Sequence, residues 1–292
     1  DSVIYLTEID SGYANGNVTL IQQKQTINAD ALHYHKKPES DAVSYEAVGN
    51  VVIEEGTRIA TCGHAIYNRD AGKTVLKVNP EIDDGGRNLS GTEISLYYEN
   101  EQLKTLLIPS KAHMVSPQFG WRKTVSDSLT QRDSVETIND LRGKTLNGFF
   151  IGGELDSLRL EGMARSVYHV FEDSIYKGIN EASGDTITML FDKEDMEEIL
   201  ISGGARGTFI PDSTNEKTES PISYASKKIQ YLTDEELTLL EKNASVTHEN
   251  TKLTAGYMKL NMKSNVINAL PTLPNDTTEI LIRPTVEEKG KE

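Results

Sequence analysis

The sequence has little of what marks several common protein classes. It holds no run of about 18 apolar residues, which excludes a membrane-spanning helix. Its opening residues, DSVIYLTEID, lack the features of a signal peptide, so we expect a cytoplasmic protein or a mature or trimmed form. Lysine and arginine number 30 against 45 acidic residues, giving a net charge of -15. A nucleic-acid-binding protein needs a basic face to neutralise phosphates, and we therefore expect no nucleic-acid partner.

Cysteine is also scarce, and catalytic signatures are missing. The lone Cys62 cannot form an internal disulfide and is predicted to be a small buried side chain. No G-x-S-x-G motif occurs, and no plausible cysteine–histidine nucleophile. Adjacent acids such as Glu54-Glu55 point to opposite faces of a strand, so they cannot act as a dyad. His33 and His35 share a strand face without an evident third metal ligand. We predict no enzyme, no catalytic residue, no metal and no cofactor.

What the chain does contain is a repeated pattern. Apolar and small residues of 16–34 recur in 49–67 at a displacement of 33, and 79–96 and 243–260 repeat part of the same set. The pattern of 103–112 returns after 52 residues and again after a further 41. Spacings of two predominate, so each copy reads as two short strands with alternate side chains on one face. Helical signal is almost absent.

One such unit cannot bury its apolar face alone, whereas stacked units bury a continuous one. The sequence therefore predicts an all-β fold: one elongated, solenoid-like domain over residues 1–292, with two facing sheets and about seven windings. Residues 116–139, which include the one tryptophan, Trp121, are predicted to be an insertion loop in the fourth winding. Small residues at matching places, such as Ala29, Gly91 and Gly184, indicate that the sheet faces approach closely there.

Several of these segments resemble the OstA/LptA family of periplasmic lipopolysaccharide-transport proteins. In the family's usual pattern an acidic residue stands where this chain has Thr92, and a glycine where it has Val78, while Asp185 keeps the acidic residue. The segments that carry the resemblance are Gly49–Glu54, Ala29-Asp30 with Leu32 and Tyr34, Gly72–Ile94, Asn180–Phe191 and Ile201–Phe209.

The resemblance implies a β-jellyroll or "taco", two sheets folded in a V around an apolar groove that carries lipid A acyl chains across the periplasm. It implies a non-enzymatic bridge whose partners are lipopolysaccharide or a related glycolipid, other Lpt-type β-jellyroll proteins joined end to end by strand addition, and an outer-membrane β-barrel. The implied location is the periplasm of a Gram-negative-type bacterium, in association with the outer membrane. The length fits both an elongated OstA-like protein and the N-terminal periplasmic region of LptD.

Inward-facing apolar positions are the predicted lipid-binding groove, in which small residues would leave room for acyl chains. Burying about a dozen methylenes there would contribute roughly 10 kcal/mol, at about 0.8 kcal/mol each. Ser95, beside Ile94, is expected to face outward. The predicted groove residues are Val18, Leu20, Ile27, Ala29, Leu32, Val51, Ile53, Ala60, Ala65, Ile82, Leu89, Ile94, Leu96, Leu106, Ile108, Leu146, Leu158, Leu160, Ile187, Met189, Ile199, Ile201, Val246, Leu253 and Met258.

Two other functions stay open at this point. A structural or adhesive repeat protein would have the same apolar positions packed into a dry core, because protein interiors are close-packed. A carbohydrate-active β-solenoid enzyme would need several acidic or basic residues on one outer face, and the sequence assembles no such cluster. Tyr34, Tyr67 and Tyr231 fit either packing at the edge of a core or a polar tip at a groove mouth. Arginines such as Arg58 and Arg142 are candidate contacts for lipid phosphates, although the acidic balance argues against this.

Overall fold

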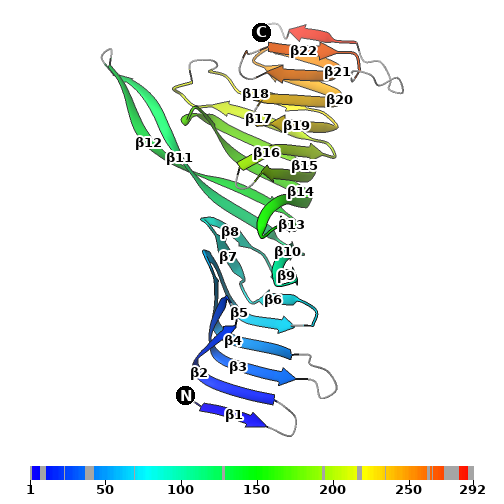
Figure 1. Ribbon diagram of the computed structural model, residues 1–292. Coiled ribbons are helices and arrows are strands. Elements are labelled where there is room, and N and C mark those ends of the chain that lie inside the picture. The colour runs from blue at the N-terminus through cyan, green and yellow to red at the C-terminus, as the bar shows by residue number, and fades with distance from the viewer. Residues whose placement is uncertain are drawn as a thin grey trace. The chain divides into compact units, whose positions relative to one another are not determined.

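A computed structural model gives the architecture (Figure 1). It describes residues 2–6, 11–22, 24–36, 43–68, 70–126, 129–192, 195–215, 219–233, 235–261, 264, 266–272 and 283–288. All regular structure in these ranges is β-strand, which confirms the predicted fold class. Contacts divide the chain into two compact units, unit 1 (residues 1–115 and 143–156) and unit 2 (residues 116–142 and 157–292). The single-domain organisation stays a prediction.

The described residues form 23 strands along the chain. The first strands are β1 (Ser2–Leu6), β2 (Ser11–Gln22), β3 (Gln25–Lys36), β4 (Val43–Glu55), β5 (Arg58–Asn68), β6 (Lys73–Lys77), β7 (Glu81–Asp84), β8 (Arg87–Ser90), β9 (Glu93–Glu99), β10 (Gln102–Ile108), β11 (Ala112–Ser126) and β12 (Leu129–Gly143). The rest are β13 (Thr145–Ile151), β14 (Glu154–Glu172), β15 (Ile175–Asp192), β16 (Asp195–Ser202), β17 (Arg206–Pro211), β18 (Ile222–Ala225), β19 (Lys228–Leu232), β20 (Leu237–His248), β21 (Thr251–Asn261), β22 (Val266–Leu270) and β23 (Thr285–Glu288).

In unit 1 the long antiparallel strands β2–β5 each serve two sheets. In β3 and β4 the pairing register shifts in mid-strand, between Asn28 and Ala31 and between Val48 and Val51, so each strand has two halves. Strand β5 shows the result, because residues 64–68 pair with β6 while residues 58–61 pair with β7. The halves 25–28 of β3, 52–55 of β4 and 58–61 of β5 form one sheet with β7 and β8, which we call sheet A. The halves 31–36 of β3, 43–48 of β4 and 64–68 of β5 form a second sheet with β6, β9 and β10, which we call sheet B.

The repeated Gly-Asn phrase forms the corner at which a strand passes from one sheet to the other. Gly16-Asn17 and Gly49-Asn50 both have positive φ values, between 39° and 82°, at the places where the register shifts. This backbone region favours glycine and asparagine. Equivalent positive-φ corners, spaced as the sequence repeats are, lie at Val78-Asn79, Lys111, Gly162-Met163, Gly203-Gly204 and Lys242-Asn243.

An acidic or hydroxyl side chain of the preceding strand holds several of these corners. Asn50 Nδ2 donates a hydrogen bond of 2.9 Å to Asp30 Oδ2. Asp185 packs so closely on Gly203 that a Cβ there would collide with it. Thr92, which stands where the family pattern has an acid, donates from Oγ1 to the Ser110 carbonyl at 3.3 Å. Thr92 therefore also contacts its corner by a hydrogen bond, but as a donor, whereas Asp30 is an acceptor.

Unit 2 uses the same scheme. Strands β14 and β15 pair over most of their length, with a register shift at the Gly162-Met163 corner. One half of β15 pairs with β16 and the other with β17, and β20 likewise pairs with both β18 and β19. Figure 1 shows β19, β20, β21 and β22 lying side by side. The core of unit 2 forms between these two rows of half-strands.

Residues 116–139, which the sequence analysis predicts as an insertion loop, are instead part of β11 and β12, apart from 127 and 128, which lie outside the described residues. Figure 1 shows the two strands side by side as a long ribbon. Thr137 Oγ1 donates to the Gln118 carbonyl at 3.3 Å, and Asn139 Nδ2 donates to Gln118 Oε1 at 3.2 Å. The prediction of a loop was wrong because the segment matches no repeat copy, although its residues still form a hydrogen-bonded strand pair.

Candidate functional site

The predicted groove residues all lie in the interior between the two rows of strands. Twenty of the twenty-five are at most 9% exposed, and none of the set is classed as exposed. Half-buried exceptions are Val18, Leu20, Leu32, Ile53 and Leu253. Four of these five belong to strands β2–β4, so the interior is more open there than further along unit 1. Whether these side chains bind lipid remains a prediction.

A pocket lies between sheets A and B of unit 1, at the half-buried positions. The empty space in and around it is about 540 Å³, of which most is open solvent at the mouth and only a small part is enclosed between the sheets. Apolar and small side chains form most of its walls, and both sheets contribute to them. The lining residues are Gln25, Ile27, Leu32, Tyr45, Ala47, Ile53, Glu55, Arg58, Ala60, Ala65, Tyr67, Thr74, Leu96 and Tyr98. Six of them (Ile27, Leu32, Ile53, Ala60, Ala65 and Leu96) are predicted groove residues.

Polar side chains gather at one end of this pocket, where the tips of the strands meet. Gln25 and Glu55 are cross-strand partners, and Gln25 Nε2 donates to Glu55 Oε2 at 2.7 Å. Tyr98, from sheet B, hydrogen-bonds with Gln25. Burial raises the Tyr98 pKa to about 12, and the nearby Glu55 charge adds to this effect. The phenol therefore stays protonated at neutral pH.

Tyrosines from neighbouring strands form a row in sheet B. The ring centroids of Tyr34 and Tyr45 are 5.5 Å apart, and those of Tyr45 and Tyr67 are 6.0 Å apart. Tyr45 and Tyr67 line the pocket. Tyr231 lies in unit 2, where burial raises its pKa to about 12. Tyrosine has an apolar ring and a polar tip, so this row suits the boundary between an apolar pocket and water.

The interior beyond the pocket is densely packed. Ile108 and Leu146 in unit 1, and Leu160, Ile187 and Leu240 in unit 2, are 0% exposed. Gly91 and Gly184 do not leave room for a chain as predicted. A Cβ at Gly91 or Gly184 would collide with Ile108 or Ile201, so the protein's own isoleucine fills that space. Both positions need glycine because another part of the chain lies very close, as predicted. The close contact is with a neighbouring strand, whereas the prediction placed it between the two sheet faces.

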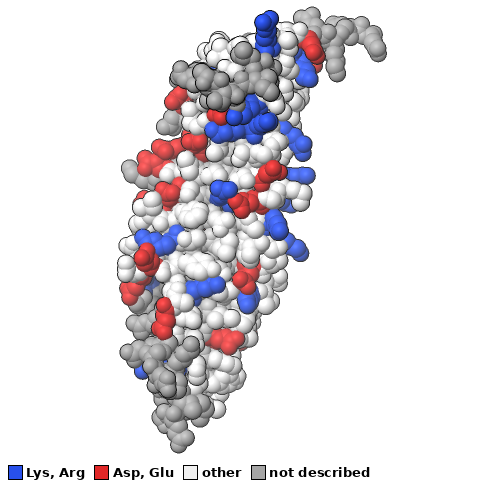
Figure 2. Space-filling model, turned by 90° about the vertical axis from the view of Figure 1, so that its right-hand side faces the viewer, with Lys and Arg blue, Asp and Glu red and all other residues white. Residues whose placement is uncertain are grey.

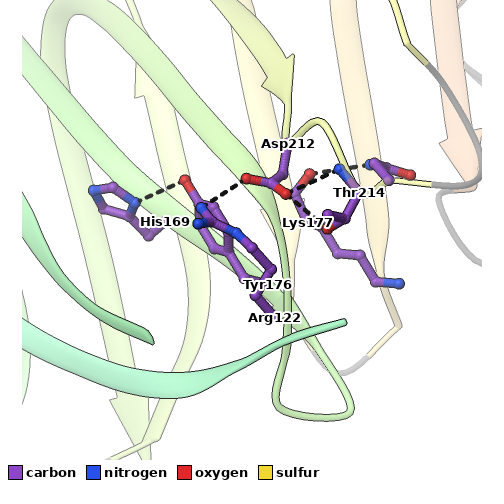
Figure 3. A network of polar contacts seen from close by, with 7 residues as sticks. Arg122, His169, Tyr176, Lys177, Asp212 and Thr214 are labelled. Carbon is purple, nitrogen blue, oxygen red and sulfur yellow. Dashed lines mark hydrogen bonds and ion pairs between the residues drawn. The ribbon is translucent and has the colours of Figure 1, made fainter. Parts of the chain in front are cut away.

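Figure 3 shows a polar network in unit 2 that the sequence did not predict. Arg122 of β11 forms an ion pair with Asp212, with Nη2 and Oδ2 2.8 Å apart, and its guanidinium lies 5.3 Å from the centre of the Tyr176 ring. The Tyr176 hydroxyl oxygen in turn lies 3.3 Å from His169 Nδ1, within hydrogen-bond distance. Burial lowers the pKa of His169. The network fixes β11 to the β14–β15 pair, and its members are too far apart in sequence for any pattern to have linked them.

Burial also acts on Asp212 and would raise its pKa. Hydrogen bonds from the backbone and hydroxyl of Thr214, together with the Arg122 charge, outweigh this and lower the Asp212 pKa below its usual value. Thr214 Oγ1 donates to Asp212 Oδ1 at 2.7 Å, and the Thr214 backbone N–H does so at 3.0 Å. The side chain of Asp212 is 9% exposed. It is thus a well-partnered carboxylate with a structural role.

Charged residues make local pairs both at the unit 1 pocket, which Arg58 lines, and on the outer surface, where Arg142 lies. Arg58 pairs with Asp84 at 3.2 Å, and Arg142 pairs with Asp140 at 2.8 Å. Acidic and basic side chains are intermixed on the face that Figure 2 displays. Among the described residues, no group of three or more histidine, cysteine, aspartate or glutamate side chains is placed to hold a metal ion. No helix in the described ranges is long and apolar enough to cross a membrane.

Two single-residue predictions had opposite outcomes. Cys62 is 8% exposed, which confirms that it is a small buried side chain. Ser95 is 2% exposed, so the expectation that it faces solvent was wrong. Strand alternation correctly separates it from Ile94, but alternation gives only the face of the sheet and not what covers that face. An exposed residue such as Thr61 of β5 is therefore the better outward reference.

Comparison with known proteins agrees with the resemblance seen in the sequence. Residues 4–102 match the family model described as LptA/(LptD N-terminal domain) LPS transport protein. A solved structure of LptH, the LptA homologous periplasmic component of the lipopolysaccharide transport device from Pseudomonas aeruginosa, matches with 14% identity and a TM-score of 0.42, over 52% of this chain and 95% of that one. No curated protein matches the chain. The family match confirms the predicted resemblance to the OstA/LptA family, and it spans the whole pocket.

Proposed function

We propose that this protein is a non-enzymatic component of lipopolysaccharide transport, and that the pocket of unit 1 takes an acyl chain of the transported glycolipid. The observation that carries the proposal is the apolar pocket between the two sheets, all of whose lining residues fall within the family match of residues 4–102. Its location would be the periplasm, in association with the outer membrane.

The pocket walls suit an acyl chain. Ala47, Ala60 and Ala65 leave space between the sheets, while Ile27 and Ile53 supply apolar surface. Each buried methylene would contribute about 0.8 kcal/mol, so even half of a twelve-carbon chain would gain roughly 5 kcal/mol. Tyr45 and Tyr67 would lie where the chain joins its polar head.

The packed interior of unit 2 favours a different role for that part of the chain. Leu160, Ile187 and Met258 are 0% exposed and already fill the space between its strands. Close packing of this kind leaves little space for an acyl chain beside these three residues. We infer that unit 2 has a structural role. For this unit the alternative of a structural repeat protein with a dry core therefore holds. Glycolipid contact is then expected in unit 1 alone.

A crosslinking experiment tests the proposal. A photo-reactive amino acid replaces Ile53, which lines the pocket and is half-buried, in cells that make lipopolysaccharide. Thr61, exposed on the outside of β5, is the matched control in unit 1, and Ile187 is the control for the packed unit 2. We expect lipopolysaccharide adducts at Ile53 and none at the other two positions. If the protein is folded and no lipopolysaccharide adduct forms at Ile53, the proposal is contradicted.

A further inference from the structure

The polar end of the unit 1 pocket contains a hydrogen-bond acceptor, Glu55, whose partner Gln25 also hydrogen-bonds with Tyr98 of the facing sheet. Gln25 and Glu55 come from the tip of sheet A, Tyr98 comes from sheet B, and all three line the pocket. Gln25 donates one hydrogen bond to Glu55, at 2.7 Å. A carboxylate can accept about four hydrogen bonds, so Glu55 keeps acceptor capacity toward a molecule in the pocket.

The charge at this end is negative. Arg58 is the one cation among the lining residues, and it is engaged by Asp84 at 3.2 Å and by the Phe150 ring, 5.7 Å from the guanidinium. Glu55, the cross-strand partner of Arg58, and Asp84, which lies outside the pocket lining, thus share one guanidinium, so these three residues together carry a net charge of -1. Burial, with the Glu55 charge, raises the pKa of Tyr98 to about 12, so its phenol is uncharged.

We propose that this polar end recognises an uncharged hydrogen-bond donor, a hydroxyl or an amide N–H, that the ligand carries next to its acyl chain, and that Glu55 is the acceptor. A phosphate or carboxylate at the same place is disfavoured by repulsion from Glu55. The inference rests on the proposed function, because the acyl chain has to enter the pocket for its head to meet Glu55. It identifies Glu55 as a specificity-determining residue and gives the chemical class of the ligand group that binds at the mouth of the pocket.

Matched twelve-carbon probes test the inference on the full chain. 1-Monododecanoylglycerol carries hydroxyls beside its chain, and dodecanoate carries a carboxylate there. Each is titrated, below the concentration at which it forms micelles, against a fluorescent apolar dye bound to the protein. We expect the wild type to bind the glycerol ester about tenfold or more tightly than dodecanoate, since like charges repel strongly in a partly buried site.

Two variants locate the effect. Glu55→Gln keeps the shape of the side chain and removes its charge, so the preference should fall at least several-fold. Glu54→Gln removes the same charge from the exposed neighbour, and the preference should stay unchanged. Equal affinities of the wild type for the two probes, or an unchanged preference in folded Glu55→Gln, would overturn the inference while leaving the pocket as an acyl-chain site. Failure of both probes to displace the dye would count against the proposed function and this inference together.

Discussion

Arg122 and Asp212 form an ion pair of 2.8 Å that joins strand β11 to the residue that follows β17, 90 positions further along the chain. Asp212 is also held by two hydrogen bonds from Thr214, which makes it the most heavily partnered carboxylate of this network. The pair belongs to unit 2, whereas the pocket is lined by residues of unit 1 alone. We therefore expect it to affect stability without affecting ligand binding.

Replacing Asp212 with Asn should lower the free energy of unfolding by about 1–2 kcal/mol, because a charge-assisted contact and two accepted hydrogen bonds are weakened. Urea titration followed by circular dichroism measures it. Glu161→Gln is the control, since Glu161 and Arg159 form an exposed pair, with side chains 44% and 52% exposed, and such pairs contribute little. Equal losses in the two variants would contradict the structural role of Asp212.

The same carboxylate should make stability depend on pH. Its pKa is lower in the folded protein than in the unfolded chain, where an aspartate titrates near 4. Its contribution is therefore fully present above about pH 4 and is lost as the pH falls through the folded pKa. Melting temperatures measured at pH 7 and pH 3 should differ less in Asp212→Asn than in the wild type. A variant that loses as much stability in acid as the wild type would exclude Asp212 from this effect.

Adjacent corner glycines should differ in their tolerance of alanine. Gly203 and Gly204 both have positive φ, 79° and 63°, so either alanine would cost about 1 kcal/mol in backbone strain. A Cβ at Gly203 would in addition collide with Asp185, whereas a Cβ at Gly204 would meet nothing within 4 Å. Gly203→Ala should thus be the more destabilising in thermal melts. Combining it with Asp185→Gly should relieve the collision, and identical melting temperatures for the two single variants would refute this account of the corner.

Cys62 should react slowly with thiol reagents in the native protein. It is 8% exposed, and burial raises its pKa, so little thiolate is present or accessible near neutral pH. Labelling with an aromatic disulfide reagent should be complete within minutes in urea and slow in buffer. Because Cys62 lies at the bend of β5, rapid native labelling would mean that the two sheets separate at that corner far more readily than the structure indicates.

The repeat made much of the fold predictable. Gly16-Asn17 and Gly49-Asn50 stand out in the sequence because a positive-φ corner restricts the residue types that fit, and the same constraint places the strands on either side. Period-two alternation then identified inward positions such as Ile94 and Leu160, both 0% exposed. These are local constraints, which a single sequence records.

Properties that depend on distant segments were not predictable in this way. Nothing near Gly91 in the sequence indicates that Ile108 fills the space beside it. The burial of Ser95 and the ion pair between Arg122 and Asp212 likewise depend on segments that are distant in sequence and close only in the fold. The groove along the whole chain stays a prediction, and nothing in the sequence indicated the pocket that side chains of β3–β6 and β9 form in unit 1.

The most direct measurement of the central claim is mass spectrometry of lipid extracted from the purified protein, made in cells that synthesise lipopolysaccharide. The wild type should carry lipid A acyl chains. Ile53→Asp, which places a charge in the pocket wall, should carry none, while Ile59→Asp, at a side chain that is 43% exposed on β5, should retain them. A wild-type protein without lipid, or one whose lipid is unaffected by Ile53→Asp, would contradict the assignment of the unit 1 pocket as the acyl-chain site.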